Sequence, residues 1–115
     1  MLSTQKAAKG FRIPKRTARL VFEGDLEGAE VVVRLDVRIG DYLKIQDLIA
    51  EEHYLEVFEV FADAALVEWN LERDDGTPIP ATGTGMKEID ITMATRILTE
   101  WTEVATQPPA PLEEA

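Results

Sequence analysis

Cysteine is absent from this 115-residue chain, and histidine occurs once. Without cysteine the chain forms no disulfide framework, thiolate metal site or thiol nucleophile, and we expect a cytosolic protein. The single histidine, His53, lies beside Glu51 and Glu52, where a carboxylate neighbour would favour a general-base role. No residue nearby supplies a nucleophile, so the sequence does not predict an enzyme.

Glycine-rich phosphate loops and calcium loops are also missing. Gly83-Thr84-Gly85 does not follow a predicted strand and lacks a third glycine in register, and the chain has no Gly-Lys-Ser/Thr motif. Asp74-Asp75-Gly76 resembles the start of a calcium loop, but the twelfth position counted from Asp74 is Gly85 instead of a glutamate. We therefore expect no cofactor, no metal ion and no small-molecule substrate.

Long apolar segments are missing as well. No uncharged apolar run approaches the roughly 20 residues that a membrane-spanning helix needs. Residues 1–6 lack the apolar segment of a secretory signal. The sequence thus predicts a soluble protein that does not enter membranes.

Charge is abundant and unevenly distributed. The formal net charge is −10, yet six bases precede the first acid, Glu23. These bases are Lys6, Lys9, Arg12, Lys15, Arg16 and Arg19. The remaining chain carries six bases against 22 acids, which disfavours binding to nucleic-acid phosphates. The basic segment contains one aromatic residue, Phe11, so we expect it to fold onto the acidic body or onto another subunit.

Alternating apolar residues predict a β-hairpin near the start of the chain. Its strands run from Arg19 to Phe22 and from Val31 to Val37, and residues 24–28 supply the turn. Val31 and Val33 share one face of the second strand. An isolated hairpin is only marginally stable in water, so this face must pack on helices or extend another sheet.

Helical spacing predicts three helices after the hairpin. The first begins at Gly40-Asp41, and its buried stripe comprises Tyr42, Ile45, Leu48 and Ile49. The last follows Ile89, a staple residue, and Asp90, an N-cap, and its buried face comprises Ala94, Ile97, Leu98, Trp101, Val104 and Ala105.

The middle helix is expected to run from about Glu51 to Trp69. A narrow acidic ridge, which we interpret as a solvated face, crosses it, and its members are Glu52, Glu56, Glu59 and Asp63. The rest of its surface is mostly apolar, which indicates either the core of its own domain or an interface with a second chain. We therefore expect a homo-oligomer.

The fold class that these elements predict is α+β, with the N-terminal β-hairpin packed on a small bundle of three to four helices. Residues 1–15 are expected to form a flexible basic arm, and residues 16–106 a single domain. Residues 107–115, rich in proline and glutamate, are expected to form a disordered tail. Gly83–Met86 is expected to be flexible.

The passage from Trp69 to Thr82 looks most like a signature. Asp74-Asp75-Gly76-Thr77-Pro78 favours a tight reversal with left-handed backbone, and the prolines stiffen it. The middle helix must then end near Asn70. A stiff loop joining two helices is either an ordered connector or a platform for contacts with a partner.

The order of these features resembles the tail assembly chaperones of long-tailed bacteriophages. The resemblance covers about Arg19 to Ala105, and it rests on Leu20–Glu23, Glu30–Arg34, Ile39–Leu43, Val67–Glu72 and Asp75–Thr82. The stretch from Trp-Asn-Leu-Glu to Pro-Ala-Thr is its most specific part. The chain departs from the family pattern after Thr82, where Gly83–Lys87 is richer in glycine.

The resemblance implies a non-enzymatic viral protein that acts in the host cytoplasm during phage assembly. Its partners would be the tape-measure protein, whose hydrophobic helices it covers, and the tail-tube protein, which it helps to recruit. A structural minor tail or tail-completion subunit is the alternative. The residues expected to bind a partner are Phe58, Phe61, Trp69, Asn70, Leu71, Pro78, Pro80 and Trp101.

Overall fold

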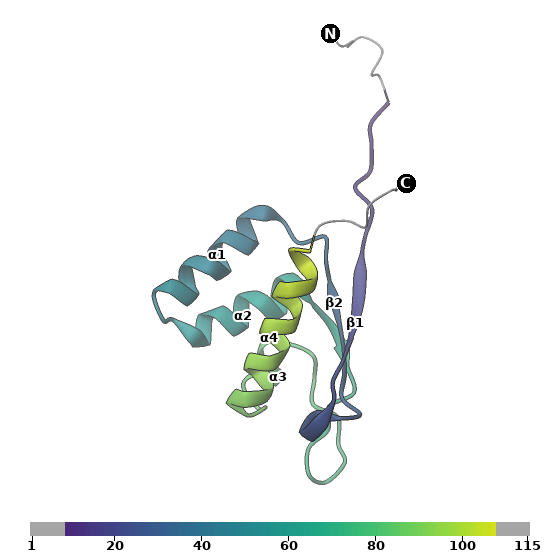
Figure 1. Ribbon diagram of the computed structural model, residues 1–115, viewed down its shortest axis with the longest axis vertical. Helices are drawn as coiled ribbons and strands as arrows, with labels where there is room; N and C mark the ends of the chain where they lie inside the picture. Colours follow the sequence, from purple (N-terminus) through teal and green to yellow (C-terminus); the bar gives the residue numbers. More distant parts are fainter. Residues whose placement is uncertain (1–8, 108–115) are drawn as a thin grey trace.

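The computed structural model describes residues 9–107, and it confirms the α+β fold class. A three-stranded antiparallel sheet in the order β1-β2-β3 forms one layer. Four helices form a second layer, which lies on one side of the sheet (Figure 1). The core fills the space between the two layers.

The predicted hairpin forms the first two strands. β1 (Thr17–Val21) pairs with β2 (Glu30–Arg34), and a short 3-10 helix, η2 (Gly24–Leu26), lies in their connection. Val31 and Val33 are buried toward the helices, as the alternation predicted, and Leu20 of β1 is buried as well. The second strand ends at Arg34 instead of the predicted Val37, because the chain there turns toward the first helix.

A third strand corrects the prediction of one long middle helix. The helix α2 (Tyr54–Ala65) ends four residues before Trp69, and Leu66–Trp69 forms β3. The apolar run fits a helix and a strand equally well. The strand prevails because pairing with β2 satisfies backbone groups on the edge of β2 that would otherwise lack partners. The loop after Trp69 therefore leaves a strand and does not join two helices.

The helix α1 (Ile39–Ala50) begins one residue before the predicted start, with Ile45 and Leu48 buried on its inner stripe. The middle helix was predicted to begin at Glu51, but residues 51–53 form the turn between α1 and α2. Glu52 there has a φ of 62°, a left-handed conformation that interrupts the helical run.

The last two helices follow the proline-containing loop. α3 (Gly83–Met86) is a single helical turn in which Gly85 and Met86 are buried. The prediction that this segment is flexible is therefore wrong. The segment is ordered because it packs closely against the preceding loop. α4 (Ile91–Ala105) begins at the predicted N-cap, where the Asp90 carboxylate accepts a hydrogen bond of 2.8 Å from the Met93 amide.

Aromatic side chains connect the two layers. Trp101 of α4 is fully buried, and its indole nitrogen donates a 3.0 Å hydrogen bond to the carbonyl of Arg34 at the end of β2. Phe61 of α2 packs edge-on against Trp101 with ring centroids 5.2 Å apart. The helical layer is thereby fixed to the sheet through the middle of the domain.

The described part of the predicted basic arm, residues 9–15, together with Arg16, which precedes β1, is called the exposed arm below. It contains no helix or strand, every residue in it is exposed, and it extends away from the domain (Figure 1). Residues 1–8 of the predicted arm and residues 108–115 of the predicted tail lie outside the described residues.

Candidate partner-binding groove

An apolar groove of about 660 Å³ opens between α1, α2 and α4. Each helix contributes residues to its walls: Gln46, Ile49, Tyr54, Phe58, Ile91, Thr95, Leu98, Thr99, Thr102 and Glu103. The volume lies in the range of sites that bind ligands or side chains of a partner.

The wall formed by α4 follows from helical spacing. Ile91, Thr95, Leu98 and Thr102 succeed one another at intervals of four, three and four residues, so they share one stripe of the helix. A neighbouring stripe, which includes Ile97 and Trp101, is buried against the core. The helix therefore has a core-facing side and a second, groove-facing side.

Large apolar side chains surround the groove while remaining exposed to solvent. Of the residues that line it, Ile91 is 67% exposed and Tyr54 is 52% exposed. Phe58 and Leu98 are partly buried and pack against the core. Apolar exposure of this kind, gathered around one concavity, is typical of an interaction surface.

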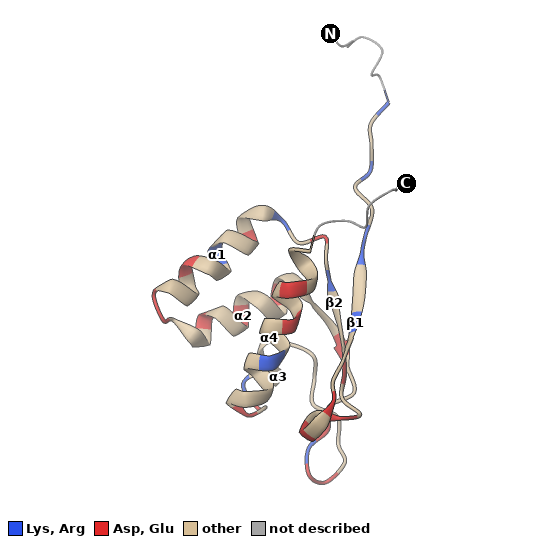
Figure 2. Ribbon diagram, viewed as in Figure 1, with Lys and Arg blue, Asp and Glu red and all other residues tan. Residues whose placement is uncertain are grey.

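The surroundings of the groove are acidic. Glu103 is the one charged residue in its lining. Residues 39–65 and 91–105, which include the three helices around it, contain nine acids and two Lys or Arg residues. Acidic residues, coloured red, recur along these helices (Figure 2). An apolar floor within an acidic surface suits a partner that is amphipathic and basic.

The eight predicted partner-binding residues fall in different places. Phe58 lies in the groove wall. Phe61 and Trp101 have no exposed surface, and they pack together in the core. Helical spacing places each of these residues on an apolar stripe of its helix. It does not tell whether that stripe is exposed or, as here, buried where α2 meets α4.

Trp69 and Asn70 hold the proline-containing loop in place. The Trp69 indole donates a 2.6 Å hydrogen bond to the Ile79 carbonyl. The Asn70 side chain accepts from the Glu30 amide at 2.8 Å and donates to the Gly28 carbonyl at 2.9 Å. These two residues of the signature therefore join β3 to the loop and to the β1–β2 turn. Leu71 is partly buried, and its carbonyl accepts from the Ile79 amide at 3.0 Å.

The loop itself is a small hairpin closed by Arg73. The Arg73 amide donates to the Thr77 carbonyl at 2.8 Å, and Gly76 at the turn has the left-handed φ of 86° that the sequence predicted. The guanidinium donates to both carboxylate oxygens of Glu88 at 2.8 Å and to the Pro78 carbonyl at 3.1 Å. Its bidentate hydrogen bonds lower the pKa of Glu88.

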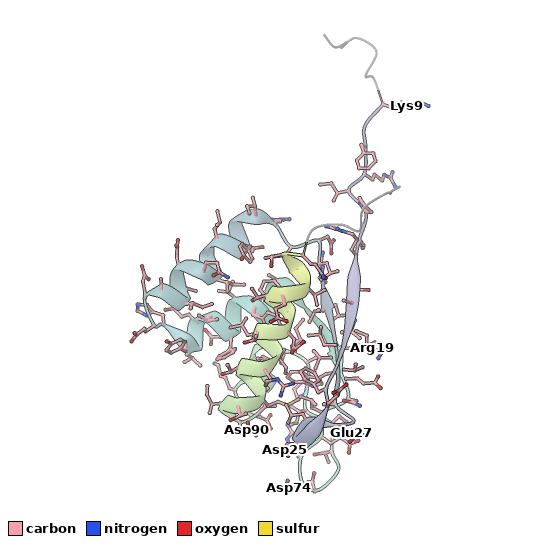
Figure 3. The ribbon with its side chains drawn as sticks, viewed as in Figure 1. Lys9, Arg19, Asp25, Glu27, Asp74 and Asp90 are labelled. Carbon is pink, nitrogen blue, oxygen red and sulfur yellow. The ribbon has the colours of Figure 1, made fainter. Side chains whose placement is uncertain are left out.

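Asp75 and the prolines lie on the outer side of this loop. Asp75 accepts hydrogen bonds from the amide and the hydroxyl of Thr77 at 3.0 and 2.7 Å, and these bonds lower its pKa. Pro78 and Pro80 are exposed. Asp74 marks the tip of the loop, at the opposite end of the molecule from Lys9 of the exposed arm (Figure 3). Neither proline is among the residues that line the groove.

Of the predicted acidic ridge, Glu56, Glu59 and Asp63 lie on α2, whereas Glu52 lies in the turn before this helix. Glu59 forms a 2.7 Å ion pair with Lys87, and Glu56 lies 3.6 Å from the His53 imidazole. Within residues 9–107, no group of three or more His, Asp or Glu side chains is arranged to hold a metal ion. No helix in that part of the chain is long and apolar enough to cross a membrane.

Comparison with known proteins yields no relative. No protein-family model matches the chain, and no curated protein and no solved structure matches it.

Proposed function

We propose that this protein is a tail assembly chaperone of a long-tailed bacteriophage, which binds and solubilises the tape-measure protein in the host cytoplasm and helps recruit tail-tube subunits. The resemblance of its sequence motifs suggests the family. The apolar groove between α1, α2 and α4 is the observation that carries the mechanism, because it gives amphipathic helices a place to bind.

In the proposed mechanism, a helix of the tape-measure protein lays its apolar stripe along the groove. Residues spaced at i, i+3, i+4 and i+7 on that helix would contact Tyr54 and Phe58 on one wall and Ile91 and Leu98 on the other. A contact confined to this one groove would be reversible, as a chaperone requires. The net charge of −10 would keep the coated filament soluble.

Co-expression tests this function. Wild-type protein should raise the soluble yield of the tape-measure protein from the same phage, and Ile91→Glu should abolish that gain by placing a charge at the groove. Val21→Glu is the matched control, because Val21 has a similar exposed fraction, 64% against 67%, but lies on β1 away from the groove. Equal yields with both variants would refute binding through the groove.

A structural tail subunit is the second candidate, and the open sheet favours it. β1 and β3 are edge strands, so either can pair with a strand of a neighbouring protein. This candidate predicts a fixed copy number in mature particles, whereas the chaperone is absent from them. Quantitative mass spectrometry of purified virions distinguishes the two, since a stoichiometric amount would exclude a purely transient chaperone.

A further inference from the structure

We propose that the groove of one protomer receives the exposed arm of a second copy of the chain, so that the protein self-associates through arm exchange. This contact goes beyond the proposed function, because it joins two copies of the chain. It uses the groove to which the tape-measure helix is proposed to bind, so the two occupants exclude one another. The proposal joins two features of the same protein: an exposed basic segment that carries two apolar side chains, and an apolar groove between acidic helices.

The exposed arm presents two large apolar side chains to solvent. Phe11 is 85% exposed and Ile13 is 81% exposed, higher fractions than those of the other exposed large hydrophobic residues in the described part of the chain. On extended backbone, residues two apart point to the same side, so Phe11 and Ile13 form one apolar pair while Arg12 points to the other side. Such a pair suits insertion into a concave apolar surface.

The groove matches this pair in chemistry and in size. Tyr54, Phe58, Ile91 and Leu98 offer apolar walls, and a volume of about 660 Å³ accommodates more than one large side chain. Thr95 and Thr99 along α4 add hydroxyl groups that can form hydrogen bonds with the backbone of an extended segment, whereas the Thr102 hydroxyl already donates to the Leu98 carbonyl. An extended occupant therefore fits as well as a helical one.

Charge favours the arm as the occupant. Residues 9–16 contain four bases and no acid, whereas the helices around the groove are strongly acidic. Figure 2 shows the bases along the arm and the acids over the helical layer. The C-terminal segment 108–115, the other candidate from this chain, contains two acids and no base, so the acidic surroundings disfavour it.

The direction of the arm favours a second copy over the same molecule. The arm continues the line of β1 and leaves the domain at the end farthest from the loop tip (Figure 1). Lys9 lies at its far end, well clear of the helices (Figure 3). Phe11 and Ile13 are thus held away from the groove of their own protomer, where a neighbouring molecule can reach them.

Sedimentation analysis of the full chain, without any tape-measure protein, tests the proposal. Wild-type protein should self-associate with rising concentration, and salt should weaken the association. The double variant Phe11→Ser/Ile13→Ser should lower the association constant by at least about tenfold, the loss expected for one buried apolar side chain. Val21→Ser, which removes an exposed apolar residue from β1, should leave it unchanged.

A peptide with the sequence of residues 9–16 provides the second readout. It should bind the Phe11→Ser/Ile13→Ser protein, and an Ile91→Glu substitution in that protein should abolish the binding. A monomeric wild type, or self-association that the double variant retains, would overturn arm exchange. Peptide binding to the double variant but not to a monomeric wild type would place the arm in its own groove instead. At protein concentrations too low for association, the double variant should keep the wild-type melting temperature, because its altered side chains are exposed in the single protomer.

Discussion

Substituting Gly85 by alanine tests how the loop and α3 are packed. A Cβ atom added at Gly85 would lie 1.7 Å from the Pro80 carbonyl oxygen and 2.9 Å from the carbonyl carbon. Both neighbours are backbone atoms, so the clash cannot be relieved by a side-chain rotation. Overpacking a buried site typically costs about 1 to 3 kcal/mol, and a backbone clash belongs at the upper end of that range.

The matched control is Gly83→Ala in the same helical turn. The nearest atom to a Cβ there, the Cα of Glu59, lies 3.9 Å away, an ordinary contact. Replacing a glycine in a helix stabilises by roughly 0.5 to 1 kcal/mol, so this variant should be neutral or slightly more stable. By calorimetry, Gly85→Ala should melt at least about 10 °C lower than wild type. Equal melting temperatures for the two variants would refute the close packing of Pro80 on Gly85.

Three further predictions concern stability. Asn70→Ala removes two side-chain hydrogen bonds to the β1–β2 turn, so it should lower the free energy of unfolding in urea by about 1 to 2 kcal/mol. An unchanged urea midpoint would contradict the role of Asn70 in joining β3 to this turn. Asp90→Ala should cost about 1 kcal/mol through loss of the N-cap of α4, and Asp90→Asn should retain most of the stability. Arg73 lowers the pKa of Glu88 in the folded state below its ordinary value of 4.5. The pair therefore stabilises the fold at pH values above 4.5, and this stabilisation is lost as the pH falls through the lower pKa of the folded state. In Glu88→Gln, the free energy of unfolding should fall less steeply as the pH is lowered through this range than it does in the wild type. An unchanged pH dependence would contradict the stabilising role of the ion pair.

Much of the fold was predictable because local patterns and tertiary packing agree. Alternation at Val31 and Val33 predicted the buried face of the hairpin, and Asp90 predicted the start of the last helix. β3 was missed because Leu66–Trp69 continues the apolar character of α2 without an intervening turn. Only the pairing of these residues with β2, a long-range contact, decides between helix and strand.

The groove was less accessible to sequence reasoning than the fold. Ile49 and Leu98 were expected on buried helix faces, but each lies at the boundary between core and groove. Ile91 was overlooked, although its spacing of seven residues from Leu98 is a detectable signal. Residues of the signature from Trp69 to Thr82 were expected to bind a partner, because its sequence is unusual. In the structure, the hydrogen bonds of Trp69 and Asn70 hold the loop against the sheet.

Size-exclusion chromatography with light scattering on the protein mixed with the tape-measure protein tests the central claim most directly. With wild-type protein we expect a soluble complex that contains many copies of the chain for each tape-measure protein. Ile91→Glu should remove the complex, and Val21→Glu should leave it intact. A self-assembled particle that ignores the tape-measure protein, or a complex that Ile91→Glu does not weaken, would contradict binding of the partner through the groove.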